Sequence, residues 1–170
     1  YCTSTYPQTL KKGFISNSVV SPDGLFKIYY WDNGAGGTMR YYENVFQYKW
    51  NGKVKSCLLP HPDTGDGANN GFGAEEIYDV NEGGICYYIV KYFMIGSTRD
   101  KEEGVKAFVV DSNGQLNDTI KLFESDGRFD NDLSYGYDAF DTTIDRETHV
   151  IYFDKHMKSL FIPMTETYDK

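Results

Sequence analysis

Hydrophobic and polar residues alternate along most of this chain in a pattern that predicts β-hairpins. In five stretches, an apolar and aromatic run is followed by a short polar turn with Asp, Asn or Gly and then by a second such run. Asn and Gly accept the positive φ that tight turns need, and β-branched and aromatic residues suit a pleated surface. The stretches are residues 19–32, 46–59, 77–92, 107–123 and 150–164, with turns at residues 21–24, 51–52, 81–84, 111–114 and 154–156. The sequence therefore predicts an all-β protein built of antiparallel hairpins.

The pattern also predicts which faces of the strands are buried. Every second residue is large and apolar within residues 26–30 and 46–50, so these strands should bury one face. Residues 85–95 are apolar in both registers, which is typical of a strand that is covered on both faces at the centre of a sheet. The charged residues 98–106 read as an exposed connection between two strands.

The spacing of the turns bears on the architecture. The first four turns recur about every 30 residues, which is typical of a propeller or a long meander. We expect an antiparallel hairpin meander that is propeller-like with few short blades, and a two-sheet sandwich or a barrel is the alternative. Two long loops interrupt the spacing, at residues 60–73 and 125–137. The chain is expected to form one domain over residues 1–170, with residues 1–12 as an extended N-terminal segment.

Composition and charge narrow the classes of partner. A chain of 170 residues with 40% hydrophobic content can bury a core of its own, and an aromatic content of 16% fits strands with half-buried rings. A net charge of −8 with scattered basic residues argues against nucleic acid and against anionic membrane surfaces. No apolar stretch approaches the roughly 18 to 20 residues that span a bilayer. We therefore expect no nucleic-acid partner and no membrane-spanning segment.

The chain has three cysteines, so at least one thiol has no intramolecular partner. Cys57 and Cys86 lie in predicted strands and could approach each other, but two free thiols in or near the core are the favoured interpretation. The first residues lack an initiator Met, which suggests a trimmed product. Attachment of a lipid to Cys2 is a less favoured hypothesis, because the residues that would define such a signal are absent.

One segment resembles known families. The Ser-Pro-Asp-Gly turn at residues 21–24 and the aromatic strand that ends at Trp31-Asp32 resemble a hairpin from propeller blades of the WD40 and TolB-like kinds. Together with Gly-Gly-Thr-Met at residues 36–39, this segment is similar to an uncharacterised family of exported bacterial all-β proteins. The resemblance implies a secreted, periplasmic or cell-surface location, and it carries no catalytic residues.

Two acidic segments are candidates for a cation. Residues 63–70 concentrate carboxylates, amides and glycines, and Ca²⁺ takes 6 to 8 oxygen ligands from such groups. The spacing does not match an EF-hand, so a solvated acidic loop is favoured, and the same holds for Asp126, Asp130 and Asp132. The histidines and cysteines show no zinc spacing. We expect no cofactor, with Ca²⁺ as the alternative.

Signs of catalysis are weak. The Gly-rich residues 33–37 precede a predicted strand, so they are expected to form a hairpin connection and not a phosphate cradle, which works at the N-terminus of a helix. No nucleophile elbow is present. A glycosidase needs only two carboxylates at a suitable separation. The acids to test are Glu75, Glu76 and Asp79, together with Asp126, Asp130 and Asp132.

The surplus of aromatic residues favours binding over catalysis. Many rings come in adjacent pairs, and neighbours on a strand point to opposite faces, so a buried ring leaves its neighbour outside. Exposed rings near carboxylates and amides stack on sugars or anchor a protein partner. A ring-lined concavity is expected near Trp31 or the loop 60–73. The predicted ligand-binding residues are Tyr29, Trp31, Tyr42, Asp63, Asp66 and Asn69.

Three functions remain open at this point. The first is a secreted or envelope-associated binding module that recognises a glycan, a peptide or a protein through aromatic and Asp/Asn/Gly-rich loops. The second is a carbohydrate-active hydrolase that uses paired carboxylates. The third is a structural β domain of a larger assembly. The sequence favours the first over the second and does not separate it from the third.

Overall fold

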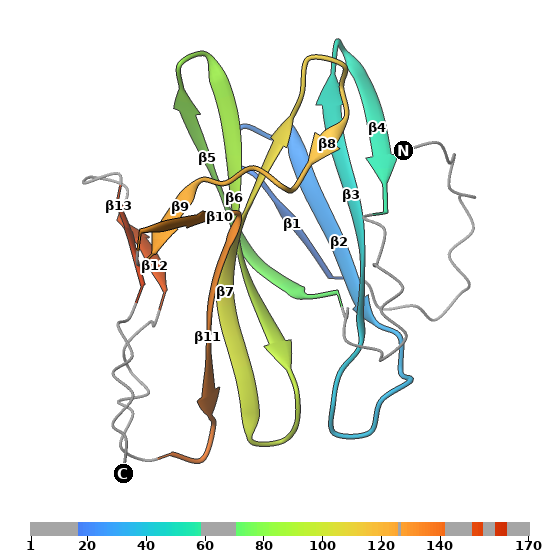
Figure 1. The fold of residues 1–170 in the computed structure, drawn as a ribbon. Coiled ribbons are helices and arrows are strands. Elements are labelled where there is room, and N and C mark those ends of the chain that lie inside the picture. Colours follow the sequence, from blue (N-terminus) through green and yellow to red (C-terminus); the bar gives the residue numbers. More distant parts are fainter. Residues whose placement is uncertain (1–16, 59–70, 126, 142–150, 155–158, 163–170) are drawn as a thin grey trace.

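The protein is all-β in the part of the chain that the structure, a computed structural model, describes. That part comprises residues 17–58, 71–125, 127–141, 151–154 and 159–162. Thirteen strands and no helix are found there (Figure 1). The described residues accordingly contain no helix with the length and apolar character needed to cross a membrane.

The first sheet is an antiparallel meander of four strands in chain order. Its strands are β1 (Asn17–Val20), β2 (Phe26–Asp32), β3 (Tyr42–Trp50) and β4 (Lys53–Cys57).

The second sheet is also antiparallel, with the order β11-β7-β6-β5 and a short strand, β8, beside β7. Its strands are β5 (Gly73–Glu82), β6 (Ile85–Ile95), β7 (Asp100–Val110), β8 (Leu116–Asn117) and β11 (Asp132–Asp138). Two small hairpins complete the described strands: β9 (Phe123–Ser125) with β10 (Arg128–Asp130), and β12 (Tyr152–Asp154) with β13 (Ser159–Phe161).

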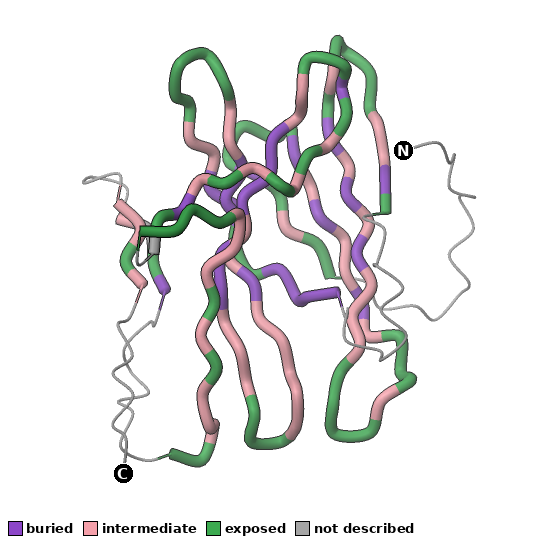
Figure 2. Tube along the Cα trace, viewed as in Figure 1, coloured by how far each residue is buried: buried purple, intermediate pink, exposed green. Residues whose placement is uncertain are grey.

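The two sheets pack face to face around a shared core, and Figure 2 shows buried residues along the inner strands of both. Phe26 and Phe46 from the first sheet meet Tyr88 and Phe108 from the second, and the rings of Phe26 and Tyr88 stack with centroids 4.6 Å apart. This architecture confirms the predicted antiparallel all-β fold and fits its sandwich alternative. A propeller-like arrangement is not seen in the described residues.

All five predicted hairpins are present. Each consists of two antiparallel strands, and most of the last turn, residues 155–158, lies outside the described residues. Between β3 and β4, Asn51 and Gly52 have φ values of 48° and 74°, the left-handed conformation that a two-residue hairpin turn requires. The alternation of apolar residues with turn residues was therefore sufficient to locate these elements.

Strand β6 is covered on both faces, as its doubly apolar pattern predicts. Tyr88 and Val90 belong to the core between the sheets, whereas Ile89 belongs to a second cluster on the opposite face. The second cluster contains Tyr78, Val105, Ala107, Phe123 and Ile151, with partly buried residues from β11 and β13. The second sheet is thus the central layer of the molecule.

The prediction of an exposed connection at residues 98–106 is wrong. Residues 100–106 form the first part of β7, which pairs with β6 on one side and β11 on the other. The charged side chains of this segment can stay in contact with solvent because they lie near the end of the strand. Gly104 and Val105, farther along the strand, are buried. The long loop predicted at residues 125–137 is likewise wrong in part, because it contains β10 and most of β11.

The chain crosses from the first sheet to the second at residues 71–73. There the buried amide of Asn44 donates from Nδ2 to the carbonyl oxygen of Phe72 at 2.8 Å and accepts from the Phe72 N–H through Oδ1 at 3.0 Å. The side chain thus takes the place of a strand partner for Phe72, next to the isolated bridge between Tyr42 and Gly71, and the polar groups of both residues are satisfied.

A second link joins the two sheets at the opposite end of the sandwich. The carbonyl oxygen of Gly114, in the turn after β7, accepts hydrogen bonds from the Tyr48 hydroxyl at 3.2 Å and from Lys55 Nζ at 2.8 Å. The same ammonium lies 4.3 Å from the centre of the Trp50 ring. This link fixes the β3–β4 hairpin against the second sheet.

Cys57 and Cys86 are free thiols, which agrees with the favoured interpretation of the sequence. Cys57 is buried in the core between the sheets, and Cys86 is half-buried at the start of β6. Cys2 lies outside the described residues.

Candidate functional site

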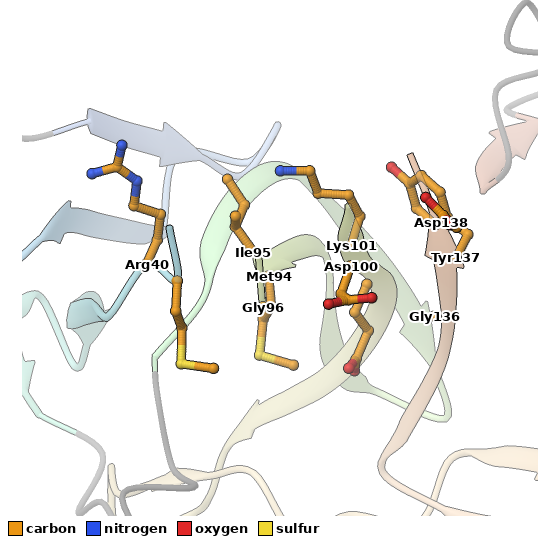
Figure 3. Close-up of a pocket in the computed structure, with 11 residues that line it drawn as sticks. Arg40, Met94, Ile95, Gly96, Asp100, Lys101, Gly136, Tyr137 and Asp138 are labelled. Carbon is orange, nitrogen blue, oxygen red and sulfur yellow. The ribbon is translucent and has the colours of Figure 1, made fainter. Parts of the chain in front are cut away.

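The candidate site is a cleft of about 510 Å³ at one end of the sandwich. Met39 and Arg40, in the loop between β2 and β3, form one wall, and the end of the second sheet forms the other. Figure 3 shows Arg40 on one side, Tyr137 and Asp138 on the opposite side, and Met94 between them. The volume falls within the range of ordinary ligand sites, about 300 to 1,000 Å³.

One row of residues runs across three strands of the second sheet and forms the wall of the cleft. Met94 in β6 is directly opposite Glu102 in β7, and Glu102 is directly opposite Gly136 in β11. Residues paired in this way point to the same face of a sheet. Met94 packs against the core between the sheets, so the whole row is on the inner face. The row offers an apolar group, then a carboxylate, and then a position without a side chain at the edge of the sheet.

The loop from residue 33 to 41 is held tightly enough to serve as a wall. The N–H of Arg40 donates to the carbonyl oxygen of Ile95 at 2.9 Å, and its guanidinium pairs with Asp32 at 2.9 Å. The pKa of the Asp32 carboxyl is lowered, mainly by the hydrogen bond from the Gly34 N–H and to a smaller extent by the Arg40 guanidinium. A side chain at Gly36 would overlap the Tyr41 ring. The loop is a connection between two strands, as the sequence predicts.

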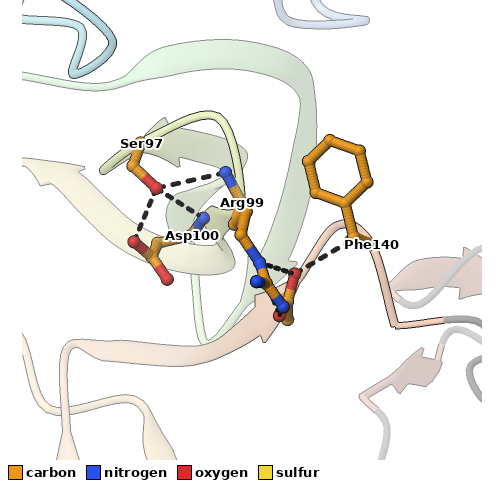
Figure 4. A network of polar contacts seen from close by, with 5 residues as sticks. Ser97, Arg99, Asp100 and Phe140 are labelled. Atoms are coloured by element: carbon orange, nitrogen blue, oxygen red, sulfur yellow. Dashed lines mark hydrogen bonds and ion pairs between the residues drawn. The ribbon is translucent and has the colours of Figure 1, made fainter.

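The other wall is fixed by a polar network at the turn between β6 and β7 (Figure 4). Arg99 donates from Nε to both carboxylate oxygens of Asp138 in β11, at 3.0 and 3.2 Å. This guanidinium is the main cause of a lowered pKa at Asp138, whose Oδ1 also accepts the Phe140 N–H. Ser97 donates to Asp100 at 2.6 Å and accepts two backbone N–H groups of the turn. The turn and the end of β11 therefore form one rigid edge.

The charges at the cleft are unequally compensated. Arg40 is paired with Asp32, and Asp138 is paired with Arg99. Lys101 also lines the cleft, but it neighbours Glu102 in β7 and therefore points to the opposite face of the sheet. In the described part of the chain, no ion pair or hydrogen bond involves the Glu102 carboxylate. The inner face of the cleft thus carries a net negative charge centred on Glu102.

The rings predicted to bind ligand are packed within the protein to different degrees. Tyr29 is half-buried, with Lys27 Nζ 4.3 Å from its ring centre. Tyr42 is half-buried and contacts Phe93 edge to face at 5.6 Å. Trp31 is only 8% exposed, so the expected open ring is not found at this position. The other predicted binding residues, Asp63, Asp66 and Asn69, lie outside the described residues, and the Ca²⁺ alternative at that loop stays a prediction.

The two groups of acids considered for hydrolysis lie on different strands, far apart in the fold. Glu75 pairs with Lys91 at 2.8 Å, and Glu76 accepts from the Tyr78 hydroxyl at 2.7 Å. These residues and Asp79 are on β5, whereas Asp130 and Asp132 are on β10 and β11. Strands β5 and β11 are opposite edges of the second sheet, about 14 Å apart at about 4.8 Å per strand. Asp126 lies outside the described residues. The geometry described gives the hydrolase alternative no support from these two groups of acids.

Sequence reasoning missed the residues that form the cleft wall. Glu102 was hidden in a charged segment that was interpreted as a connection, and Gly136 in one interpreted as a loop. A signal was nevertheless present, because Tyr135, Gly136 and Tyr137 alternate as in a strand. Glycine inside a strand often marks a place where a ligand or another backbone comes close.

Comparison with known proteins gives no family assignment. No family model matches the chain, and neither a curated protein nor a solved structure is significantly similar to it. The resemblance of residues 21–39 to exported bacterial proteins stays a prediction, and the function has to be argued from the geometry of the cleft.

Proposed function

We propose that this protein is a binding module that takes up a segment of a protein or peptide partner in the cleft between the loop 33–41 and the end of the second sheet. The observation that carries the proposal is the row of Met94, Glu102 and Gly136 opposite Met39. Two thioether side chains make an apolar and adaptable lining, and one carboxylate supplies a polar anchor.

A peptide fits this lining better than a glycan does. Glycan sites present flat exposed rings, whereas here the Tyr137 ring of the lining is half-buried and stacks on Tyr135 with centroids 5.5 Å apart. Nearby, Trp31 is buried and Tyr42 packs against Tyr30 and Phe93. Methionine side chains pack well against aliphatic side chains of varied shape. The walls of the cleft are held by backbone and ion-pair contacts, so little ordering entropy is lost when a ligand binds.

The proposed setting is outside the cytoplasm, in the periplasm, at the cell surface or secreted. It rests on the resemblance of residues 21–39 to exported bacterial proteins. Cell fractionation of the organism that makes the protein tests it independently of binding, and recovery in the cytoplasm alone would contradict it.

The binding proposal is tested by selection from a displayed library of random linear peptides. We expect enriched sequences whose affinity falls at least about tenfold in Met39→Gln, which replaces a thioether of the lining with a neutral polar amide. Val54→Gln is the matched control, because Val54 is 60% exposed on β4, outside the cleft lining. Failure to enrich any peptide, or equal loss in both variants, would reject the cleft as a peptide site. A glycan array that gives the positive result instead would reject the choice of ligand.

A further inference from the structure

We infer that the ligand binds as an additional strand along β11, with a Lys or Arg side chain that crosses Gly136 and pairs with Glu102. This inference rests on the proposed function and specifies the ligand: an extended peptide with a basic residue. It follows from the hydrogen-bonding pattern of β11, from the absence of a side chain at Gly136, and from the uncompensated charge of Glu102.

Strand β11 is an edge of its sheet, and its backbone groups alternate between two directions. The N–H of Ala107 donates to the carbonyl oxygen of Asn131 at 2.9 Å, and the N–H of Ala139 donates to that of Arg99 at 2.7 Å. In the register of β11 with β7, the backbone N–H and C=O groups of the odd-numbered β11 residues therefore bond to β7. Those of the even-numbered residues point away from β7, toward the outer side of the sheet. No described strand pairs with this outer side. The N–H and C=O groups of Ser134 and Gly136 are thus directed at the position of an added strand.

Gly136 leaves the edge open where the cleft begins. A Cβ at this residue would have one neighbour, the Lys101 carbonyl oxygen, at 3.7 Å, which is ordinary contact. Glycine is therefore not required there by the fold, yet its lack of a side chain clears the way to Glu102. An added strand would lie about 4.8 Å from β11 and about 10 Å from β7. A Lys or Arg side chain and the Glu102 side chain together span that separation.

The charge of the cleft selects a basic side chain. Glu102 has no ion-pair partner among the described residues. Two residues farther along β7 and β11, Asp100 and Asp138 are directly opposite each other. Arg99 neutralises Asp138, which leaves Asp100 and Glu102 on the same face with a negative charge. The whole chain has a net charge of −8, so a basic peptide is also attracted at long range. An acidic residue opposite Gly136 would be repelled.

The first test uses short synthetic peptides of alternating Thr and Val with one variable central residue. Capped peptides with central Lys, Arg, Gln or Glu are titrated into the protein at low salt, and affinity is measured by calorimetry. We expect Lys and Arg to bind about tenfold more tightly than Glu. A version of the Lys peptide with Pro on both sides of the central residue should not bind, because Pro cannot donate to a strand.

Three variants separate the two parts of the inference. Gly136→Val should weaken the Lys peptide at least about tenfold by filling the passage, whereas Ser134→Val, on the same strand and face, leaves the passage to Glu102 clear and serves as the control. Glu102→Gln should reduce the preference for Lys over Glu to about twofold or less. Glu102→Lys should invert it, an outcome that damage to the fold would not produce.

The added strand has its own signature in amide hydrogen exchange. On binding of the Lys peptide, the amides of Ser134 and Gly136 should become protected, whereas those of Tyr135 and Tyr137 are protected already by β7. Binding with no new protection at Ser134 and Gly136 would overturn strand addition, and an unchanged preference in Glu102→Gln would overturn the ion pair. If library-selected peptides bind in the cleft but the Lys peptide does not, the inference fails and the proposed function stands. If no peptide binds, both fail.

Discussion

Tyr92 and Asp132 are joined by a hydrogen bond of 2.7 Å although a whole strand separates them. Tyr92 is on β6, Asp132 is on β11, and the Tyr92 ring lies over Gly104 of the intervening β7, where any side chain would overlap it. Burial raises the pKa of Asp132, and the hydrogen bond from Tyr92 and the charge of Lys106 partly offset that effect. Burial also raises the pKa of Tyr92. The contact is therefore a partly buried polar link across three strands.

Replacement of Tyr92 by Phe should destabilise the fold. The phenyl ring of the Tyr92→Phe variant would keep the packing with Phe72, 5.1 Å away in the native protein, but the Asp132 carboxylate would lose its nearest donor inside the sheet. We expect the free energy of unfolding to fall by about 1 to 3 kcal/mol, as measured by urea denaturation. Tyr152→Phe is the control: Tyr152 is exposed, so its change should stay within about 0.5 kcal/mol. Equal effects in both variants would show that the link contributes nothing.

The raised pKa of Asp132 predicts a pH dependence of stability. Between the ordinary value of 3.8 and the higher value in the fold, the native carboxyl keeps a proton that the unfolded chain has released. The free energy of unfolding therefore falls as pH rises through this window, because the native state binds more protons than the unfolded state. Asp132→Asn cannot titrate, so its stability relative to wild type should increase with pH across the window and then level off.

That relative stability is measured by denaturant unfolding of both proteins from acid to neutral pH. A difference that stays constant with pH would show that Asp132 has the same pKa in both states. A difference that decreases with rising pH would mean that the hydrogen bond from Tyr92 outweighs the effect of burial. Glu124→Gln is the control, since Glu124 is exposed on the neighbouring hairpin and is not among the groups that shift the pKa of Asp132.

The glycine turn that joins the two sheets gives a prediction with a matched control. Gly114 has a φ of 70°, and a Cβ there would overlap the Trp50 ring. Gly24 has nearly the same φ, 69°, but nothing lies near its missing side chain. Gly24→Ala should therefore cost only the backbone strain, about 1 to 2 kcal/mol. Gly114→Ala should cost at least about 1 kcal/mol more, because the ring and the Lys55 ammonium must also move.

Thermal or urea unfolding of the two variants checks this difference. Equal losses would show that the Trp50 ring adjusts freely and that the link between the sheets is soft. Lys55→Met removes the ammonium while it keeps the length of the side chain, and it should lower stability less than Gly114→Ala does, because the Tyr48 hydroxyl still donates to the Gly114 carbonyl.

The sequence predicted the hairpins well because each is specified locally. The Asn51-Gly52 turn and the alternation on either side of it determine their own geometry. The stacking of two sheets was left as an alternative, because apolar faces alone do not say which face meets which. Strand β11 was missed because it pairs with β7, about 30 residues earlier in the chain, and not with its neighbour in sequence. The cleft depends on the row Met94, Glu102 and Gly136, and only the register of three strands brings these together.

The two described cysteines predict a definite pattern of thiol reactivity. Cys57 is 6% exposed, and Cys86 is half-buried with a pKa that is raised, mainly by burial, above that of an ordinary thiol. Since the thiolate is the reactive form, Cys86 should react with a disulfide reagent more slowly than a free cysteine does, and faster as pH rises. Cys57 should react only when the core opens.

The measurement uses a Cys2→Ser background, in which Cys57→Ala and Cys86→Ala each leave one thiol. In denaturant without reductant, both thiols of the background protein should react, because no disulfide joins them. A reducing agent should leave the midpoint of thermal unfolding unchanged. Loss of both reactive thiols in the unfolded, unreduced protein would mean that Cys57 and Cys86 are bridged, and with them the strands β4 and β6 of opposite sheets. Rapid labelling of Cys57 in the native protein would instead mean that the core between the sheets opens far more often than its burial implies.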